Sequence, residues 1–184
     1  MTCRYAKNLP ALWLMTDERV GDAALLAAVA RLPRGRAGVV LRHYRTDPAE
    51  RRALFEQIAA IARRRRLVLM LAGSAREAAA WRADGWHGDG ARSAGPRLLH
   101  SMPVHDRREL VAASRARADF VFLSPLFPTR SHPGGRTLGR AGFAALAQRA
   151  DMPVMALGGV TDAHACLLPG IGASGWAAID GLTS

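Results

Sequence analysis

The sequence contains very little cysteine and no long apolar run, and each shortage excludes a class of protein. Only Cys3 and Cys166 are cysteines among 184 residues, which excludes a disulfide framework and a cysteine-based zinc site. No apolar run approaches the ~18 residues that a membrane-spanning helix needs. The stretch from Arg4 to Met15 combines basic and apolar residues, but no small-residue cleavage site follows it, so we do not expect it to be a signal peptide. We therefore expect a cytoplasmic protein without a membrane partner.

Lysine is almost absent, although the chain is strongly basic. Lysine and arginine number 26 against 15 acidic residues, which gives a formal net charge of +11, yet Lys7 is the only lysine. A protein that binds phosphate backbones normally uses both bases, so a chain-wide preference for arginine is the simpler explanation. Aromatic residues do not alternate with bases, so no stacking platform for nucleic acid is visible. Nucleic acid is therefore not an expected partner.

One dense basic run, Arg63–Arg66, lies between a helical pattern and an apolar strand. Cations are favoured at the C-terminal end of a helix because they complement the helix dipole. A solvated helix end is therefore the preferred interpretation of this run. An anion-binding or RNA-binding patch is the alternative.

Short apolar runs alternate with helical patterns along the whole chain. The predicted strands are residues 11–15, 38–41, 67–71, 85–87, 98–104, 120–123, 153–157 and 175–179. The predicted helices are residues 22–31, 48–65, 75–83, 106–116, 139–150 and 162–168, with Pro48 in a first turn and Asp106 as an N-cap. Pro103 is expected to break the fifth strand.

The strands are apolar throughout, which is typical of a parallel sheet covered on both faces. Eight such runs in alternation with helices predict an α/β protein with a (β/α)8 TIM barrel, rather than an open doubly wound sheet. No dinucleotide glycine fingerprint follows the first strand, which argues against a Rossmann fold. No linker or repeat divides the chain, so residues 1–184 are expected to form one domain.

The barrel is expected to be reduced, with its fourth and eighth outer helices short or missing. Only small and turn-forming residues lie between His87 and Leu98, and the chain ends at Ser184, soon after the last strand. Such barrels usually need at least ~200 residues. Neighbouring copies would cover the exposed strands, so a homo-oligomer is compatible with the sequence.

The first candidate site is the pair Gly158-Gly159, which follows the seventh strand. Functional groups of such barrels lie at the C-terminal ends of the strands, and phosphate commonly binds after the seventh and eighth. Adjacent glycines allow backbone amides to approach an anion closely. An ordinary strand-to-helix turn is the alternative interpretation.

The second candidate is the loop that follows the sixth strand, residues 124–135, which is rich in proline, glycine and serine. A loop at this end of a barrel strand is well placed to hold a ligand. Its hydroxyl and cationic side chains are those of Thr129, Arg130, Ser131 and His132. The alternative is an ordinary surface loop stiffened by prolines.

Taken together, these segments resemble the thiamine phosphate synthase and thiazole tautomerase (TenI) family along nearly the whole chain. The loop after the sixth strand and the Gly-Gly turn are the most specific in combination. The matching segments are residues 14–17 (LMTD), 40–42 (VLR), 84–88 (DGWHG), 118–121 (ADFV), 124–129 (SPLFPT), 153–160 (PVMALGGV) and 172–177 (GASGWA).

The resemblance implies a barrel that binds a small phosphorylated thiazole or pyrimidine ligand. In the synthases, a pyrimidine diphosphate ionises with the help of Mg²⁺, and the thiazole nitrogen captures the resulting cation. Mg²⁺ is therefore an expected cofactor only where synthase activity is retained. By resemblance, Arg42 grips the pyrophosphate, and the remaining ligand-binding positions are Thr129, Ser131, His132, Gly158 and Gly159.

Several positions depart from the family pattern. His43 and Tyr44 replace a glutamate and a lysine, and Ala72-Gly73-Ser74 replaces the segment whose aspartate binds metal. The further replacements are Pro103 for a serine, Pro125 for the tautomerase histidine, His132 for a lysine and Asp180 for a phosphate-binding serine. Asp89 and Ser101 are the residues that could substitute for the second metal carboxylate and the fifth-strand serine. No metal site is therefore assigned.

Two functions from different classes stay open. The first is an enzyme of thiamine biosynthesis, either a synthase-like transferase or, as the runner-up, a tautomerase-like isomerase. The second is a catalytically silent barrel that acts as a binding or regulatory protein. No catalytic residue is assigned, and the candidate bases are His87, His100, His105 and His164.

Overall fold

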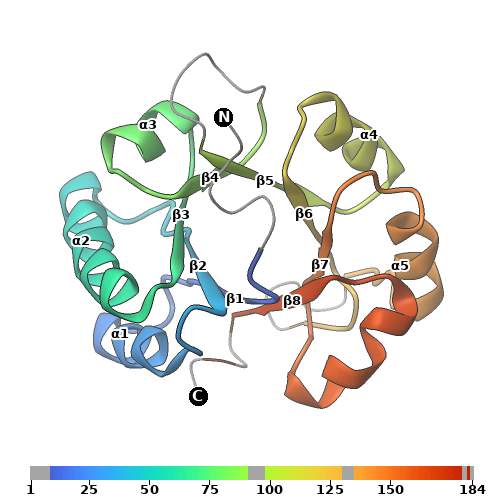
Figure 1. Cartoon of the computed structure of the whole chain (residues 1–184), viewed down its shortest axis with the longest axis horizontal. Helices are drawn as coiled ribbons and strands as arrows, with labels where there is room; N and C mark the ends of the chain where they lie inside the picture. Colours follow the sequence, from blue (N-terminus) through green and yellow to red (C-terminus); the bar gives the residue numbers. More distant parts are fainter. Residues whose placement is uncertain (1–8, 91–97, 130–134, 180–181, 183–184) are drawn as a thin grey trace.

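Eight parallel strands close into a barrel in the computed structural model, which describes residues 9–90, 98–129, 135–179 and 182. Each strand pairs with its sequence neighbours, and β8 returns to β1 (Figure 1). The strands are β1 (Leu12–Met15), β2 (Ala37–Leu41), β3 (Val68–Ala72), β4 (Gly85–His87), β5 (Leu99–Val104), β6 (Phe120–Leu123), β7 (Val154–Ala156) and β8 (Gly175–Ala178). The α/β barrel expected from the sequence is confirmed, and every predicted strand end lies within one residue of the observed end.

Helices cover the outside of the barrel between the strands (Figure 1). They are α1 (Asp22–Arg31), α2 (Pro48–Arg65), α3 (Ala75–Ala80), α4 (Arg107–Arg115) and α5 (Gly139–Ala147). None of these described helices has the length and apolarity needed to cross a membrane. Residues 91–97, 180–181, 183 and 184 lie outside the described residues, so the expectation of short or missing fourth and eighth helices stays a prediction.

The helix ends follow from local side-chain chemistry. The carboxylate of Asp47 accepts hydrogen bonds from the N–H groups of Ala49 and Glu50, so α2 begins with Pro48 in its first turn. Asp106 caps α4 as expected, because its side chain accepts from the N–H of Glu109. Each cap satisfies backbone donors that have no partner within the helix.

Three helical predictions are too long or of the wrong type. α3 ends at Ala80, and not at Ala83, because Arg82 adopts a left-handed conformation with φ 59° and closes the helix. α5 ends at Ala147 because the next turn tightens into i→i−3 hydrogen bonds. The segment predicted as a helix over 162–168 forms a 3₁₀ helix, η1 (Asp162–Leu167), and a second 3₁₀ turn, η2 (Pro169–Ile171), follows it.

The expectation that Pro103 breaks the fifth strand is wrong, because β5 continues through it. Alternate residues of a parallel strand bond to opposite neighbours, and the carbonyl of Ser101 accepts from the N–H of Gly88 on the β4 side. Pro103 shares this side with Ser101 and lies beyond the end of β4. An N–H at this position would face the carbonyl of Gly88, which instead lies 3.0 Å from Nε2 of His100. The missing N–H of Pro103 therefore removes no hydrogen bond between two strands of the sheet.

Apolar side chains fill the interior of the barrel below its C-terminal end. Trp13 stacks on Phe120 with ring centroids 5.0 Å apart and meets Phe122 edge-on at 5.7 Å. Gly38 makes room for the indole, since a Cβ at that residue would lie 2.3 Å from the Trp13 ring. The interior is thus a packed core, and the space for a ligand lies at the ends of the strands.

Candidate functional site

A cavity of about 410 Å³ opens at the C-terminal end of the barrel. This volume lies in the range of ~300–1,000 Å³ that is usual for small-molecule sites. We call this space the mouth cavity. Residues at or just beyond the ends of seven strands line it: Met15, Arg42, His87, Pro103, Ser124, Leu157 and Ile179.

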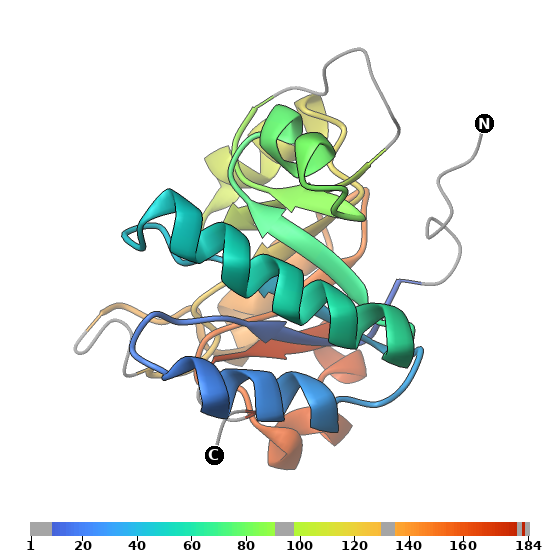
Figure 2. The same ribbon diagram turned by 90° about the vertical axis from the view of Figure 1, so that its left-hand side faces the viewer.

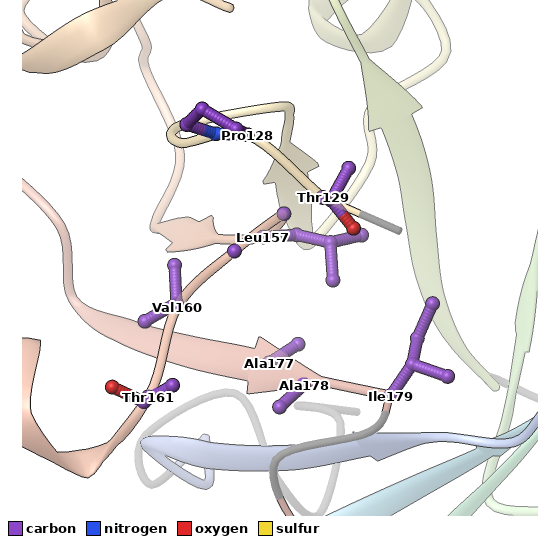
Figure 3. Close-up of a pocket in the computed structure, with 10 residues that line it drawn as sticks. Pro128, Thr129, Leu157, Val160, Thr161, Ala177, Ala178 and Ile179 are labelled. Carbon is purple, nitrogen blue, oxygen red and sulfur yellow. The ribbon is translucent and has the colours of Figure 1, made fainter. Parts of the chain in front are cut away.

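A smaller hollow of about 170 Å³ adjoins the mouth cavity, and it is shown in Figure 3. Thr129 comes from the loop after β6, whereas Leu157, Gly158 and Ile179 follow β7 and β8, and all four residues line both spaces. The structure thus brings together the two segments that the sequence singles out. We call this smaller space the glycine-turn hollow.

The glycine turn is shaped by close contact with the loop after β6. Gly158 and Gly159 have φ values of 89° and 65°, which side chains rarely adopt. A Cβ on Gly158 would lie 2.8 Å from Pro125, and one on Gly159 would lie 2.4 Å from the carbonyl oxygen of Pro128. Both positions therefore require glycine for packing, whatever the ligand.

Hydrogen bonds hold the same two segments together. The N–H of Leu126 donates to the carbonyl of Leu157 at 2.9 Å, and that of Phe127 donates to the carbonyl of Gly158 at 3.0 Å. These bonds extend the pairing of β6 and β7 beyond the strands. The loop is consequently fixed as far as Thr129, where its described part ends.

Backbone amides are the main hydrogen-bond donors around the glycine-turn hollow. The N–H groups of Gly158, Gly159 and Val160 donate no hydrogen bond to another described residue, whereas the N–H of Thr161 donates to Nδ1 of His164. The other walls are largely apolar. Figure 3 shows the hydroxyl of Thr129 on the side of the hollow and that of Thr161 turned away from it. Three consecutive amides and one hydroxyl suit an anion.

Arg42 is held rigidly in the wall of the mouth cavity by the end of β1. Its backbone N–H donates to Oγ1 of Thr16 at 2.9 Å, its Nε donates to the carbonyl of Thr16 at 2.7 Å, and its Nη2 lies 3.4 Å from Asp17. The hydrogen bond from Arg19, aided by the charge of Arg42, lowers the pKa of Asp17 to about 2. Arg42 is thus a fixed cation beside the cavity.

The end of β3, where the resemblance would place a metal-binding aspartate, carries an arginine contact instead. Arg51 of α2 donates from Nη2 to the carbonyls of Arg42 and Ala72, at 3.0 Å and 2.5 Å, and from Nη1 to Glu77 at 3.1 Å. Asp89, the remaining carboxylate candidate, is exposed in the loop after β4. Among the described residues, no three metal-ligating side chains lie together. These residues do not fit a Mg²⁺ site.

His87 is the buried imidazole of the mouth cavity. Its Nδ1 lies 3.0 Å from the hydroxyl of Ser101, so this serine is already engaged within the barrel. Burial, together with smaller contributions from the charges of Arg42 and His100, lowers the pKa of His87 to about 4. His87 therefore presents a neutral ring to the cavity at neutral pH.

The other three candidate bases have different surroundings. His105 lines the rim of the mouth cavity and lies 2.8 Å from Glu109. His100 stacks on Trp86 with ring centroids 3.6 Å apart, and His164 belongs to the cap of η1; neither lines the two spaces. Only two of the four histidines therefore face the candidate site.

The structure brings together most of the residues chosen from the sequence. Arg42, Thr129 and Gly158 line the mouth cavity, and Gly159 lines the adjoining hollow. The predictions for the loop after β6 and for the position after β8 concern Arg130, Ser131, His132 and Asp180, which lie outside the described residues. Sequence reasoning missed Arg51, which no motif marks, and named Tyr44, which is exposed at the cavity rim, only as a departure from the family pattern.

Comparisons with known proteins bear on the family and the fold of this chain. A family model described as "Thiamine monophosphate synthase" matches residues 12–182. The chain is 32% identical over 181 residues to the thiamine-phosphate synthase of Thiobacillus denitrificans, covering 93% of this chain and 86% of that protein. It is 30% identical over 177 residues to the thiamine-phosphate synthase of Aromatoleum aromaticum, covering 91% and 85%. The solved thiamine phosphate pyrophosphorylase from Pyrococcus furiosus shares the fold, with a TM-score of 0.77 and 20% identity over 94% of this chain and 87% of that one.

His87 should make the protein less stable in acid. Its pKa is about 4 in the native state and ~6.5 in an unfolded chain, so only the unfolded state gains a proton between these values. The free energy of unfolding should therefore fall by up to about 3 kcal/mol between pH 6.5 and 4 through this group. Urea titrations of the wild type and His87→Asn measure it, and the variant should show the shallower pH dependence. Identical curves for the two proteins would contradict the assignment.

Proposed function

The chain belongs to the thiamine monophosphate synthase family, and from this premise we propose that it is a protein of thiamine biosynthesis that binds a phosphorylated thiazole at the mouth of the barrel. The phosphate would lie in the glycine-turn hollow and the ring in the mouth cavity. The observation that carries the proposal is the convergence of Thr129 with the turn Gly158–Val160 around one hollow.

The glycine-turn hollow offers the phosphate directional hydrogen bonds. Gly158, Gly159 and Val160 carry amide donors that no described residue uses, and Thr129 adds a hydroxyl. Donors fixed in advance bind an anion well because little order is lost on binding. Apolar walls such as Ala178 lower the local dielectric and strengthen these bonds.

The mouth cavity has the shape and chemistry for a small planar ring. Met15 and Leu157 provide apolar surface, and the neutral imidazole of His87 provides one hydrogen-bonding group. Tyr44 lies at the rim of the cavity and is 67% exposed. An exposed aromatic ring at this place can stack on a bound heterocycle.

The described residues support binding better than the Mg²⁺-dependent coupling of a thiazole to a pyrimidine diphosphate. That coupling needs carboxylates for the metal, and the end of β3 offers the guanidinium of Arg51 instead. We therefore propose a barrel that binds the thiazole phosphate and is catalytically silent, with a binding or regulatory role. No step through the metal is assigned to this chain.

The binding proposal predicts that phosphate is required for affinity. Thiazole phosphate should raise the melting temperature, because a ligand of the native state stabilises it, whereas the unphosphorylated thiazole alcohol should have little effect. Thr129→Val should weaken the affinity for the phosphate about tenfold, since it removes a hydrogen bond to a charged group. Isothermal titration calorimetry measures both affinities.

The matched control for that experiment is Thr161→Val. Thr161 lines the same hollow, but its hydroxyl lies 3.2 Å from Nδ1 of His164 and serves the cap of η1. This variant should lose some stability and keep the affinity of the wild type. Equal losses in the two variants, or equal binding of the two thiazoles, would overturn the proposed phosphate site.

The silent assignment predicts no synthase activity. With thiazole phosphate, pyrimidine diphosphate and Mg²⁺, the protein at substrate-level concentration should form no thiamine phosphate above the uncatalysed background, because the end of β3 lacks a metal carboxylate. Chromatography of the products measures this, with the Thiobacillus denitrificans relative as the positive control. Turnover, or growth rescue of a strain that lacks its own synthase, would refute the silent role while leaving the binding proposal intact.

A further inference from the structure

Exposed arginines gather at the end of the barrel opposite the mouth. The helices α1 and α2 both finish at this end, as Figure 2 shows, and β2 and β3 begin there. None of these arginines forms an ion pair with another described residue. We call this surface the basic face, and it comprises Arg31, Arg34, Arg36, Arg63, Arg64, Arg66 and Arg82.

Hydrogen bonds join two parts of the basic face that are far apart in the sequence. The guanidinium of Arg65 donates to the carbonyl of Leu32 from Nη2 at 2.7 Å and from Nε at 3.2 Å. The N–H of Gly35 donates in turn to the carbonyl of Arg65 at 2.9 Å. The loop that carries Arg34 and Arg36 is thereby fixed against the end of α2. In the sequence only the run 63–66 stands out as basic. The other arginines of the basic face come from separate segments that the fold brings to the same end of the barrel.

The basic face is costly for the folded protein. Like charges at short range repel one another, and no described acidic side chain is paired with them. The helix dipole offsets part of this for residues in the last turn of α2, but not for the loop residues Arg34 and Arg36.

Backbone conformation adds a second cost. Arg66 and Arg82 follow α2 and α3 in the left-handed region, with φ values of 55° and 59°. The N–H of each arginine and the N–H of the residue after it donate to carbonyls in the last turn of the helix. Glycine normally occupies the position of the arginine in this helix-closing pattern.

We propose that the basic face binds the phosphate backbone of a double-stranded nucleic acid, without reading its bases. Guanidinium groups bind phosphate oxygens in bidentate fashion and carry no requirement for sequence. The face has no exposed aromatic side chain for stacking, since Trp81 beside Arg82 packs on Phe55. This favours a duplex over a single strand, whose binding usually relies on stacked bases.

A protein partner fits the basic face less well. Stable protein interfaces are anchored by buried aromatic or apolar groups. The exposed large apolar side chains of the described residues are Tyr44, at the mouth, and Val111, on α4. Neither lies on the basic face, so its recognition is electrostatic throughout.

Duplex binding should depend steeply on salt. The affinity for a duplex of about 20 base pairs should fall on the order of 10³-fold between about 50 and 200 mM salt if six arginines each neutralise one phosphate. Fluorescence anisotropy with labelled duplex RNA and duplex DNA measures this and shows whether the two backbones are distinguished. Preference for either duplex supports the proposal. Absence of binding to both at low salt, or binding only to phosphatidylserine vesicles, overturns it.

A charge-matched pair of variants separates the basic face from overall charge. One variant changes four arginines of the face, Arg34, Arg36, Arg63 and Arg64, to glutamine. The control changes four exposed arginines at the mouth end of the barrel, Arg45, Arg107, Arg108 and Arg140, to glutamine. The first variant should bind at least about tenfold more weakly, with a shallower salt dependence, and the control should bind nearly as the wild type does. Equal losses in the two variants would overturn the proposal.

A third variant guards against loss of binding through misfolding. Arg66→Gly with Arg82→Gly relieves the left-handed strain and removes two charges from the face. It should therefore melt at a higher temperature than the wild type and yet bind the duplex more weakly. A variant that is more stable and binds equally well would contradict a role for these arginines.

Discussion

The close approach of the glycine turn to the loop after β6 is the constraint on which the mouth of the barrel depends. A Cβ on Gly158 or Gly159 would lie within 2.8 Å of that loop, so only glycine permits the contact. The contact fixes Thr129 beside the turn and leaves three amides without an acceptor among the described residues. Packing and anion binding are therefore two consequences of one geometry. The ordinary-turn and phosphate-site interpretations of these glycines do not exclude each other.

The two ends of the barrel carry positive charge in different ways. At the mouth, Arg42 is held by Asp17 and by the backbone of Thr16, and Arg51 is used to bind strand carbonyls. At the opposite end the arginines of the basic face are exposed, and none of them forms an ion pair with another described residue. A single fixed charge suits one small ligand, whereas exposed charge spread over a wide surface suits a long polyanion. The relationship to the thiamine monophosphate synthase family bears only on the mouth of the barrel.

The sequence was sufficient for the architecture because strands of a parallel barrel are buried on both faces and so are apolar throughout. Prediction from the sequence failed where contacts between distant segments of the chain decide the local structure or the role of a residue. Pro103 stays within β5 because β4 ends before it, which no local pattern records. Arg51 reaches the ends of β2 and β3 from a neighbouring helix. His87 could be named only as one base among several, since its partner Ser101 lies on another strand.

The most direct test of the central claim follows the backbone amides by NMR during titration with thiazole phosphate. The account predicts that the N–H resonances of Gly158, Gly159 and Val160 shift the most, because these donors gain an acceptor on binding. The unphosphorylated thiazole should leave them in place. Shifts confined to other parts of the barrel, or equal shifts with both thiazoles, would contradict a phosphate site at the glycine turn.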